Sequence, residues 1–196
     1  MVAMGAAPVV NKLSVEEYLR MDDAAQPPFE YHDGEVFQID GASYRHALIC
    51  INFGTSLTTK LAETACRTTA GPRVRTSRTS YVHPDLVVVR GRPVFTEERS
   101  ETITNPRVVI EILSPSTADY DFGGKLALYR GLPSIEEYIL VAQDGARIDS
   151  FRKTADGNWL LSTVSGLDAT LRVESLNISV PLAEIYFSVE FPPSAE

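Results

Sequence analysis

The stretch Val108–Leu113 places one glutamate inside an otherwise aliphatic run. Its sequence, Val-Val-Ile-Glu-Ile-Leu, is short and rich in β-branched residues, which is typical of a strand buried inside a sheet. A second run, Asp85–Val89, opens with a carboxylate directly after Pro84 and continues as Leu-Val-Val-Val. Buried strands of this kind, separated by helical segments, favour an α/β fold with helices packed on a central sheet.

The remaining periodicity predicts the other elements. Ser14 and Glu17 form a capping box, and Asp33-Gly34 is a two-residue hairpin signal. We expect helices at about 15–21, 43–63 and 118–130, and strands at 29–32, 35–39, 85–89, 108–113, 137–142, 146–152 and 158–163. The predicted fold is a central mixed β-sheet flanked by helices, with an N-terminal hairpin and a C-terminal strand meander.

The size and composition fit one globular domain. The chain has 196 residues, of which 44% are hydrophobic. We expect a flexible leader at 1–12, a single domain at 13–188 and a flexible tail at 189–196. No apolar run approaches the ~20 residues needed to span a bilayer, so no membrane partner is expected. Cys50 and Cys66 lack metal-ligand spacing and favour a reducing, cytoplasmic location.

The charge distribution is uneven. A formal net charge of -8 argues against a protein covered in basic residues for binding nucleic acid. Between residues 64 and 84, however, there is no acidic residue, and Arg67, Arg73, Arg75 and Arg78 all fall there. Arg73, Arg75 and Arg78 are therefore candidates for binding substrate phosphates. The alternative, that this strip is a solvated edge strand, is equally open.

Asp85 and Glu111 are the candidate metal ligands. A carboxylate buried without a partner costs free energy, so Glu111 needs a cation, a hydrogen-bond donor or water. If the two predicted strands are neighbours, both acids reach the same end of the sheet and can share a Mg²⁺ (or Mn²⁺) ion. The alternative is that each acid faces solvent at a strand end.

Lys125 is the third candidate. It follows Asp121 and precedes Tyr129 at four-residue steps, so the three side chains share one helical face. Taken alone, Asp121 and Lys125 could be an ordinary exposed ion pair worth ~0.3–0.5 kcal/mol. The intervening Gly123-Gly124 either delays the helix or permits a close backbone approach.

A set of motifs, taken in order, is more specific than any single one. They are Phe29-Glu30-Tyr31, Asp33-Gly34-Glu35, His46, Pro84-Asp85, Glu111-Ile112-Leu113-Ser114-Pro115-Ser116-Thr117, Asp121, Lys125, Tyr129 and Glu137-Tyr138-Ile139-Leu140-Val141. Over residues 13–185 the chain resembles the bacterial restriction-endonuclease-like family often called Uma-two, within the PD-(D/E)XK nuclease superfamily. The resemblance implies a restriction-endonuclease-like core.

The resemblance also implies a set of site residues. Asp85 and Glu111 correspond to the metal-binding acids, with the carbonyl of Ile112 as a further ligand. The superfamily usually has a lysine two residues after the glutamate, but this chain has Leu113 there. Relatives in the family supply the lysine from the next helix, which corresponds to Lys125.

Glu30 and His46 complete the candidate catalytic set by the same resemblance. From the residues alone, Glu30 could be an acid at a strand edge and His46 a histidine of the core. The implied activity is metal-dependent hydrolysis of DNA phosphodiester bonds, and a homodimer is expected because many nucleases cut two strands as dimers. A catalytically inactive scaffold or regulatory DNA-binding module stays open, as does a hydrolase of small phosphorylated or sugar substrates.

Overall fold

The computed structural model describes residues 12–25, 27–39, 42–96, 101–114 and 117–192. The expected leader lies outside these ranges except for residue 12, and the expected tail is described only as far as residue 192. Pro115 and Ser116 of the turn motif also lie outside them. None of the described helices combines the length and the apolar character needed to cross a membrane.

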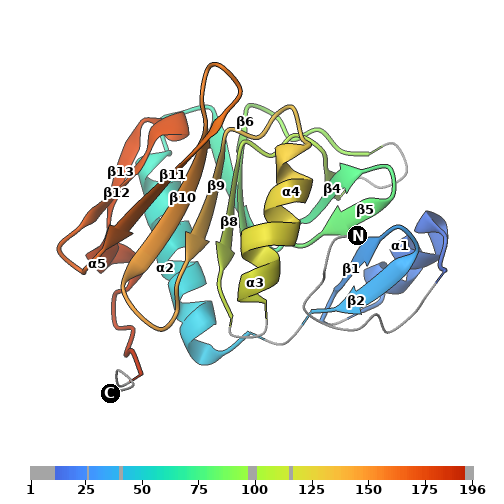
Figure 1. The fold of residues 1–196 in the computed structure, drawn as a ribbon, viewed down its shortest axis with the longest axis horizontal. Coiled ribbons are helices and arrows are strands. Elements are labelled where there is room, and N and C mark those ends of the chain that lie inside the picture. The colour runs from blue at the N-terminus through green and yellow to red at the C-terminus, as the bar shows by residue number, and fades with distance from the viewer. Residues whose placement is uncertain (1–11, 26, 40–41, 97–100, 115–116, 193–196) are drawn as a thin grey trace.

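A six-stranded mixed sheet forms the centre of the molecule (Figure 1). Its order is β11-β10-β9-β8-β6-β3, and only the β8–β9 pair is parallel. The strands are β3 (Cys66–Ala70), β6 (Leu86–Arg90), β8 (Val108–Ile112), β9 (Glu137–Val141), β10 (Arg147–Lys153) and β11 (Trp159–Ser165). β8 and β9 are buried along their whole length, as expected for central strands covered on both faces.

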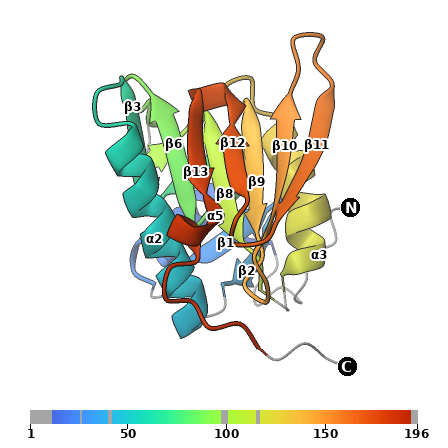
Figure 2. The same cartoon turned by 90° about the vertical axis from the view of Figure 1, so that its left-hand side faces the viewer.

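One face of this sheet is covered by α2 (Tyr44–Lys60), the hairpin of β12 (Thr170–Val173) and β13 (Ile178–Pro181), and α5 (Leu182–Ile185) (Figure 2). A short 3₁₀ turn, Glu174–Leu176, joins β12 to β13. Apolar side chains of α2, with Phe53 at their centre, pack with Val88 and Ile110 in one core cluster. This packing fixes α2 against β6 and β8.

The opposite face carries a continuous helical segment made of α3 (Ala118–Tyr120), a π-helical turn (Asp121–Lys125) and α4 (Leu126–Arg130). Tyr129 of α4 is fully buried with Val109 and Tyr138 of the sheet. The π-helical turn coincides with the Gly123-Gly124 pair. Single π turns inside α-helices are frequent at functional sites, and here the turn lies beside the candidate residues.

A second mixed sheet departs from the expectation of one central sheet. It has the order β2-β1-β5-β4-β7 and consists of β1 (Phe29–His32), β2 (Glu35–Gln38), β4 (Arg73–Ser77), β5 (Ser80–Val82) and β7 (Thr102–Ile103). α1 (Val15–Asp23) packs on it through a cluster of three tyrosines, Tyr18, Tyr31 and Tyr81. The predicted N-terminal hairpin therefore belongs to a separate sheet.

The local signals for these elements are confirmed. Ser14 and Glu17 form the predicted capping box of α1. Asp33 and Gly34 both have positive φ, +48° and +97°, as a tight hairpin turn requires. Ser43 caps α2, although that helix ends at Lys60, before the predicted position 63.

Candidate active site

Asp85 and Glu111 lie at the same end of two neighbouring strands. β6 and β8 are antiparallel with Leu86 opposite Ile110, so the next position outward places Asp85 beside Glu111. The backbone N–H of Asp85 lies 3.4 Å from Glu111 Oε2. Two acidic residues 26 positions apart in the chain therefore lie side by side, which meets the condition for a shared site.

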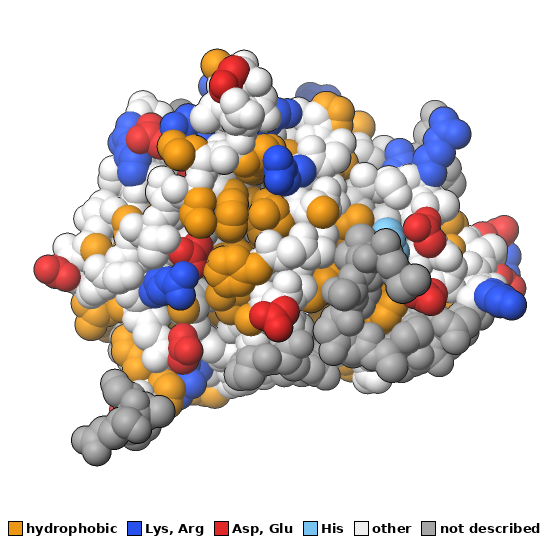
Figure 3. All heavy atoms as spheres, in the orientation of Figure 1, with side chains coloured by type: hydrophobic (Ala, Val, Ile, Leu, Met, Phe, Trp, Pro, Cys, Tyr) orange, Lys and Arg blue, Asp and Glu red, His pale blue; other side chains and the backbone are white. Residues whose placement is uncertain are grey.

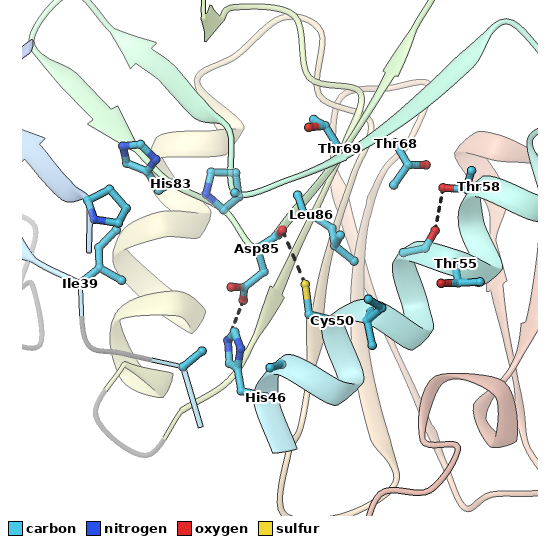
Figure 4. A pocket seen from close by; sticks show the side chains of 18 of the residues that line it. Ile39, His46, Cys50, Thr55, Thr58, Thr68, Thr69, His83, Asp85 and Leu86 are labelled. Atoms are coloured by element: carbon cyan, nitrogen blue, oxygen red, sulfur yellow. Dashed lines mark hydrogen bonds and ion pairs between the residues drawn. The ribbon is translucent and has the colours of Figure 1, made fainter. Parts of the chain in front are cut away.

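Asp85 is held by two donors on a single oxygen. The backbone N–H of Ile112 donates to Asp85 Oδ2 at 2.7 Å, and His46 Nε2 lies 3.1 Å from the same atom. His46 stands in the first turn of α2, whose packing against the sheet presents the imidazole to Asp85 (Figure 4). The Asp85 side chain remains 23% exposed, so water can reach it.

Lys125 joins three buried carboxylates. Its Nζ lies 3.1 Å from Glu30 Oε1, 3.1 Å from Glu111 Oε1 and 3.4 Å from Asp121 Oδ1. Glu30 comes from β1 of the second sheet, so this cluster ties the two sheets together. Tyr129 donates a further hydrogen bond of 2.9 Å to Glu111 Oε1.

The π-helical turn positions Asp121 for this cluster. Thr117 donates from Oγ1 to Asp121 Oδ2 at 2.7 Å, and the Tyr138 hydroxyl donates to the backbone carbonyl of Asp121 at 3.0 Å. The ammonium of Lys125 also lies 5.7 Å from the centre of the Tyr120 ring, at cation–π range. Leu113, at the usual lysine position of the superfamily, packs against the hydrophobic core instead.

The cluster contains more negative than positive charge in a place that water hardly reaches. Burial raises the pKa of Glu111 well above its ordinary value, and Lys125 only partly opposes this. The pKa of Asp121 is also raised, again mainly by burial. Burial alone would lower the pKa of Lys125, but the neighbouring carboxylates, Glu111 first, raise it well above its ordinary value and keep the ammonium charged.

The side of this cluster that faces Asp85 presents carboxylate oxygens, the type of ligand that a hard divalent cation prefers. Glu111 Oε1 is engaged by Lys125 and Tyr129, whereas the contact of Oε2 within the described residues is the long one with the Asp85 N–H. Within the described part of the chain, no three His, Cys, Asp or Glu side chains are grouped to enclose a metal ion. Two carboxylates completed by water are nevertheless the ligand set that Mg²⁺ commonly takes in proteins.

Arg73 departs from its predicted role. Its guanidinium is only 7% exposed and pairs with Asp22 at 2.7 Å and with Asp23 at 3.0 Å. Arg73 therefore joins β4 to the end of α1, and its charge is already neutralised. It is not available to a phosphate.

Arg75 and Arg78 lie away from the carboxylates. They border a hollow of about 940 Å³ that is shared with Val15 and Leu19 of α1. Among the described residues that line this hollow, none belongs to the Asp85 and Lys125 cluster. Binding of substrate by Arg75 and Arg78 stays a prediction.

Asp22 and His83 are important residues that the sequence patterns missed. Asp22 is buried and accepts from the Phe29 N–H at 2.7 Å and from Arg73, and His83 Nε2 lies 2.9 Å from it. Burial acts to raise the pKa of Asp22, but hydrogen bonds from His83, Phe29 and Arg73 outweigh it and lower that pKa. Nothing local to Asp22 signals these partners, which come from distant segments.

Comparison with known proteins supports the resemblance. The model of Uma2, a family described as "Putative restriction endonuclease", matches residues 15–183. The chain belongs to the Uma2 family. Two Synechocystis proteins, each described as an "uncharacterized protein", are similar to this Uma2 member. The protein slr1290 is 32% identical over 97% of this chain and 100% of its own length, and sll1609 is 30% identical over 85% and 95%.

A solved structure shares the fold of this Uma2 member. It is described as "a putative nuclease belonging to DUF820" from Anabaena variabilis, and superposes with a TM-score of 0.73. The match covers 89% of this chain and 97% of the other, at 18% sequence identity. At that identity the match shows the fold alone, a mixed α/β arrangement with two mixed sheets.

Proposed function

We propose that this Uma2 protein is a metal-dependent endonuclease that hydrolyses phosphodiester bonds of DNA on a restriction-endonuclease-like core. The proposal rests mainly on the position of Asp85 and Glu111 side by side at the same end of strands β6 and β8. The Lys125 ammonium lies 3.1 Å from Glu111. Membership of the Uma2 family supports the same reaction class.

The proposed metal ligands are carboxylate oxygens of Asp85 and Glu111, with the carbonyl of Ile112 as a third protein ligand and water completing the set. A bound Mg²⁺ or Mn²⁺ would supply a more acidic water and neutralise charge on the phosphate. The fit rests on the donor chemistry, since hard oxygen ligands suit these ions.

The remaining groups have roles that follow from their contacts. The Ile112 N–H and His46 hold the Asp85 carboxylate in one orientation, and the hydroxyl of Tyr129 does the same for Glu111. Neighbours that orient metal ligands commonly influence affinity as well as activity. His46 is therefore a positioning residue in this proposal.

Lys125 would stabilise the charge that develops on the phosphate. Its ammonium is already fixed in place by Glu111, Glu30 and Asp121, so little reorganisation is needed when the reaction begins. Glu30 and Asp121 act through Lys125, by holding its charge at the site. This arrangement supplies the positive charge that position 113 lacks.

The surface charge favours few contacts with the DNA backbone. Figure 3 shows Lys and Arg side chains scattered over one face rather than gathered in a stripe. Any phosphates held by Arg75 and Arg78 would make binding weaken as salt rises. Because few phosphates would be neutralised, this loss of affinity with salt should be shallow.

A plasmid-nicking assay tests the proposal. With Mg²⁺ or Mn²⁺ we expect the wild-type protein to nick supercoiled DNA, and Asp85→Ala or Glu111→Ala to lower the rate by at least about 100-fold, since even changes beyond the direct ligands often cost 10–100-fold. Omission of divalent metal should give the same loss. As a matched control, Asp156→Ala removes an exposed aspartate of a turn and should leave the rate unchanged.

The inactive-module alternative makes a different prediction. A wild-type protein that binds DNA tightly but does not cut it with either metal would be a scaffold or regulatory module. A protein that neither cuts nor binds DNA would point to a smaller phosphorylated or sugar substrate. Cutting that survives in both alanine variants would place the reaction elsewhere.

A further inference from the structure

A groove of about 790 Å³ begins at the candidate site and extends between α2 and β3. Figure 4 shows Asp85 near His46 and His83 at one side of this groove, and Thr55 and Thr58 at the other. Because Asp85 and His46 line it, the groove is continuous with the proposed metal centre. Its volume lies in the range of sites for small molecules, roughly 300–1,000 Å³.

The lining of the groove is nearly free of permanent charge. Among the described residues that border it, none is Lys or Arg, and Asp85 is the only carboxylate. The walls carry threonine hydroxyls from both elements, Thr55 and Thr58 from α2 and Thr68 and Thr69 from β3, beside apolar groups such as Ile51. A phosphate group would find no cation there, whereas an uncharged polar ring system would find both hydroxyls and apolar surface.

Three lining residues also have unused hydrogen-bonding capacity. His46 Nδ1, His83 Nδ1 and Thr68 Oγ1 are buried atoms that make no hydrogen bond with any described residue. A buried polar atom without a partner costs free energy, and such atoms are uncommon in native structures. Because these atoms have almost no exposed surface, a ligand in the groove could pair with them only after the side chains rotate toward it.

We infer that this groove binds the nucleoside of one nucleotide beside the phosphate that is cleaved. The inference rests on the proposed function and adds a substrate class to it: single-stranded or locally unpaired DNA. A base that is stacked and paired inside a duplex cannot enter a pocket, and unpairing it costs a few kcal/mol, which single-stranded DNA avoids.

Binding measured without divalent metal separates the inference from catalysis. We would follow the fluorescence anisotropy of a labelled 12-nucleotide oligothymidylate, and of the same strand paired with oligoadenylate, in the presence of EDTA. We expect the single strand to bind at least about 10-fold more tightly than the duplex, a difference in binding free energy of about 1.4 kcal/mol. Equal or tighter binding of the duplex would overturn the inference, as would no binding of the single strand.

Two substitutions fill the groove from opposite walls. Thr58→Trp on α2 and Thr69→Trp on β3 each replace an exposed threonine, and each should weaken binding of the single strand by at least about 10-fold. The matched control, Thr170→Trp, changes an exposed threonine of β12 outside the groove and should bind as wild type does. Circular dichroism identifies any variant that fails to fold.

The outcomes distinguish this inference from the nuclease proposal. In one outcome, the wild-type protein binds single strands tightly, both groove variants lose that binding, and no DNA is cut with Mg²⁺ or Mn²⁺. That result would support the nucleoside-binding groove and reject the nuclease proposal. If DNA is cut in a metal-dependent way and Thr58→Trp and Thr69→Trp leave the cutting rate unchanged, the nuclease proposal is supported and the nucleoside-binding groove is rejected.

Discussion

Replacing Asp22 with alanine should lower the free energy of unfolding by about 3–5 kcal/mol, the usual cost of removing one partner from a buried ion pair. Arg73 would keep its buried guanidinium but lose its 2.7 Å contact with Asp22. The N–H of Phe29 and the imidazole of His83 would lose the same acceptor. Urea denaturation followed by circular dichroism measures the change.

Asp23→Ala is the matched control for this experiment. Asp23 pairs with the same guanidinium, but its side chain is 39% exposed, so water can replace it. We expect a loss of no more than about 1 kcal/mol, as for exposed ion pairs. Equal losses of stability in the two variants would show that the buried Asp22–Arg73 ion pair is no more important for stability than the exposed Asp23–Arg73 pair.

Lys125→Met should destabilise the protein by a similar amount, about 3–5 kcal/mol in metal-free buffer. Methionine keeps much of the side-chain volume but removes the only ammonium that contacts Glu30, Glu111 and Asp121 in the described structure. Three buried carboxylates would then repel one another, or take up protons at a further cost. Chemical denaturation at neutral pH measures the loss.

Lys60→Met supplies the comparison for Lys125. Lys60 also pairs with a glutamate, Glu184, but the two side chains are 28% and 43% exposed. Its replacement should cost at most about 1 kcal/mol. If Lys125→Met were as stable as Lys60→Met, the buried cluster would contribute little to the fold, and its charge would be screened more than the geometry indicates.

The sequence singles out Asp85 and Glu111 as candidates, but the pairing of their strands comes from the structure. Both stand at or near the ends of short aliphatic runs, and such runs form central strands whose register follows from their hydrophobic pattern. The interruption of the second run by Glu111 was itself informative, because a carboxylate in a buried strand needs a partner. Lys125 was found from its helical spacing and from the family resemblance.

The second sheet was not predictable in the same way. β4 consists mainly of arginine, threonine and serine, and its burial does not follow a clear alternation. β7 has only two residues, Thr102–Ile103. Such strands depend on their neighbours in the fold more than on their own hydrophobicity, so no local pattern marks them.

Arg73 shows why a local charge pattern can mislead. The absence of acids near it in sequence suggested a free basic strip, but its partners, Asp22 and Asp23, lie about 50 positions earlier on α1. Pairing over that separation is a property of the tertiary fold. The same holds for Glu30, whose contact with Lys125 joins the two sheets.

Calorimetric titration with Mn²⁺ tests most directly whether Asp85 and Glu111 share a cation. The wild-type protein should show saturable binding. Asp85→Asn and Glu111→Gln, which keep the shape of each side chain but remove its charge, should each weaken that binding by at least about 10-fold. The wild-type protein and both variants could bind Mn²⁺ equally well, or the wild-type protein could show no saturable binding. Either result would contradict a metal centre at the ends of β6 and β8.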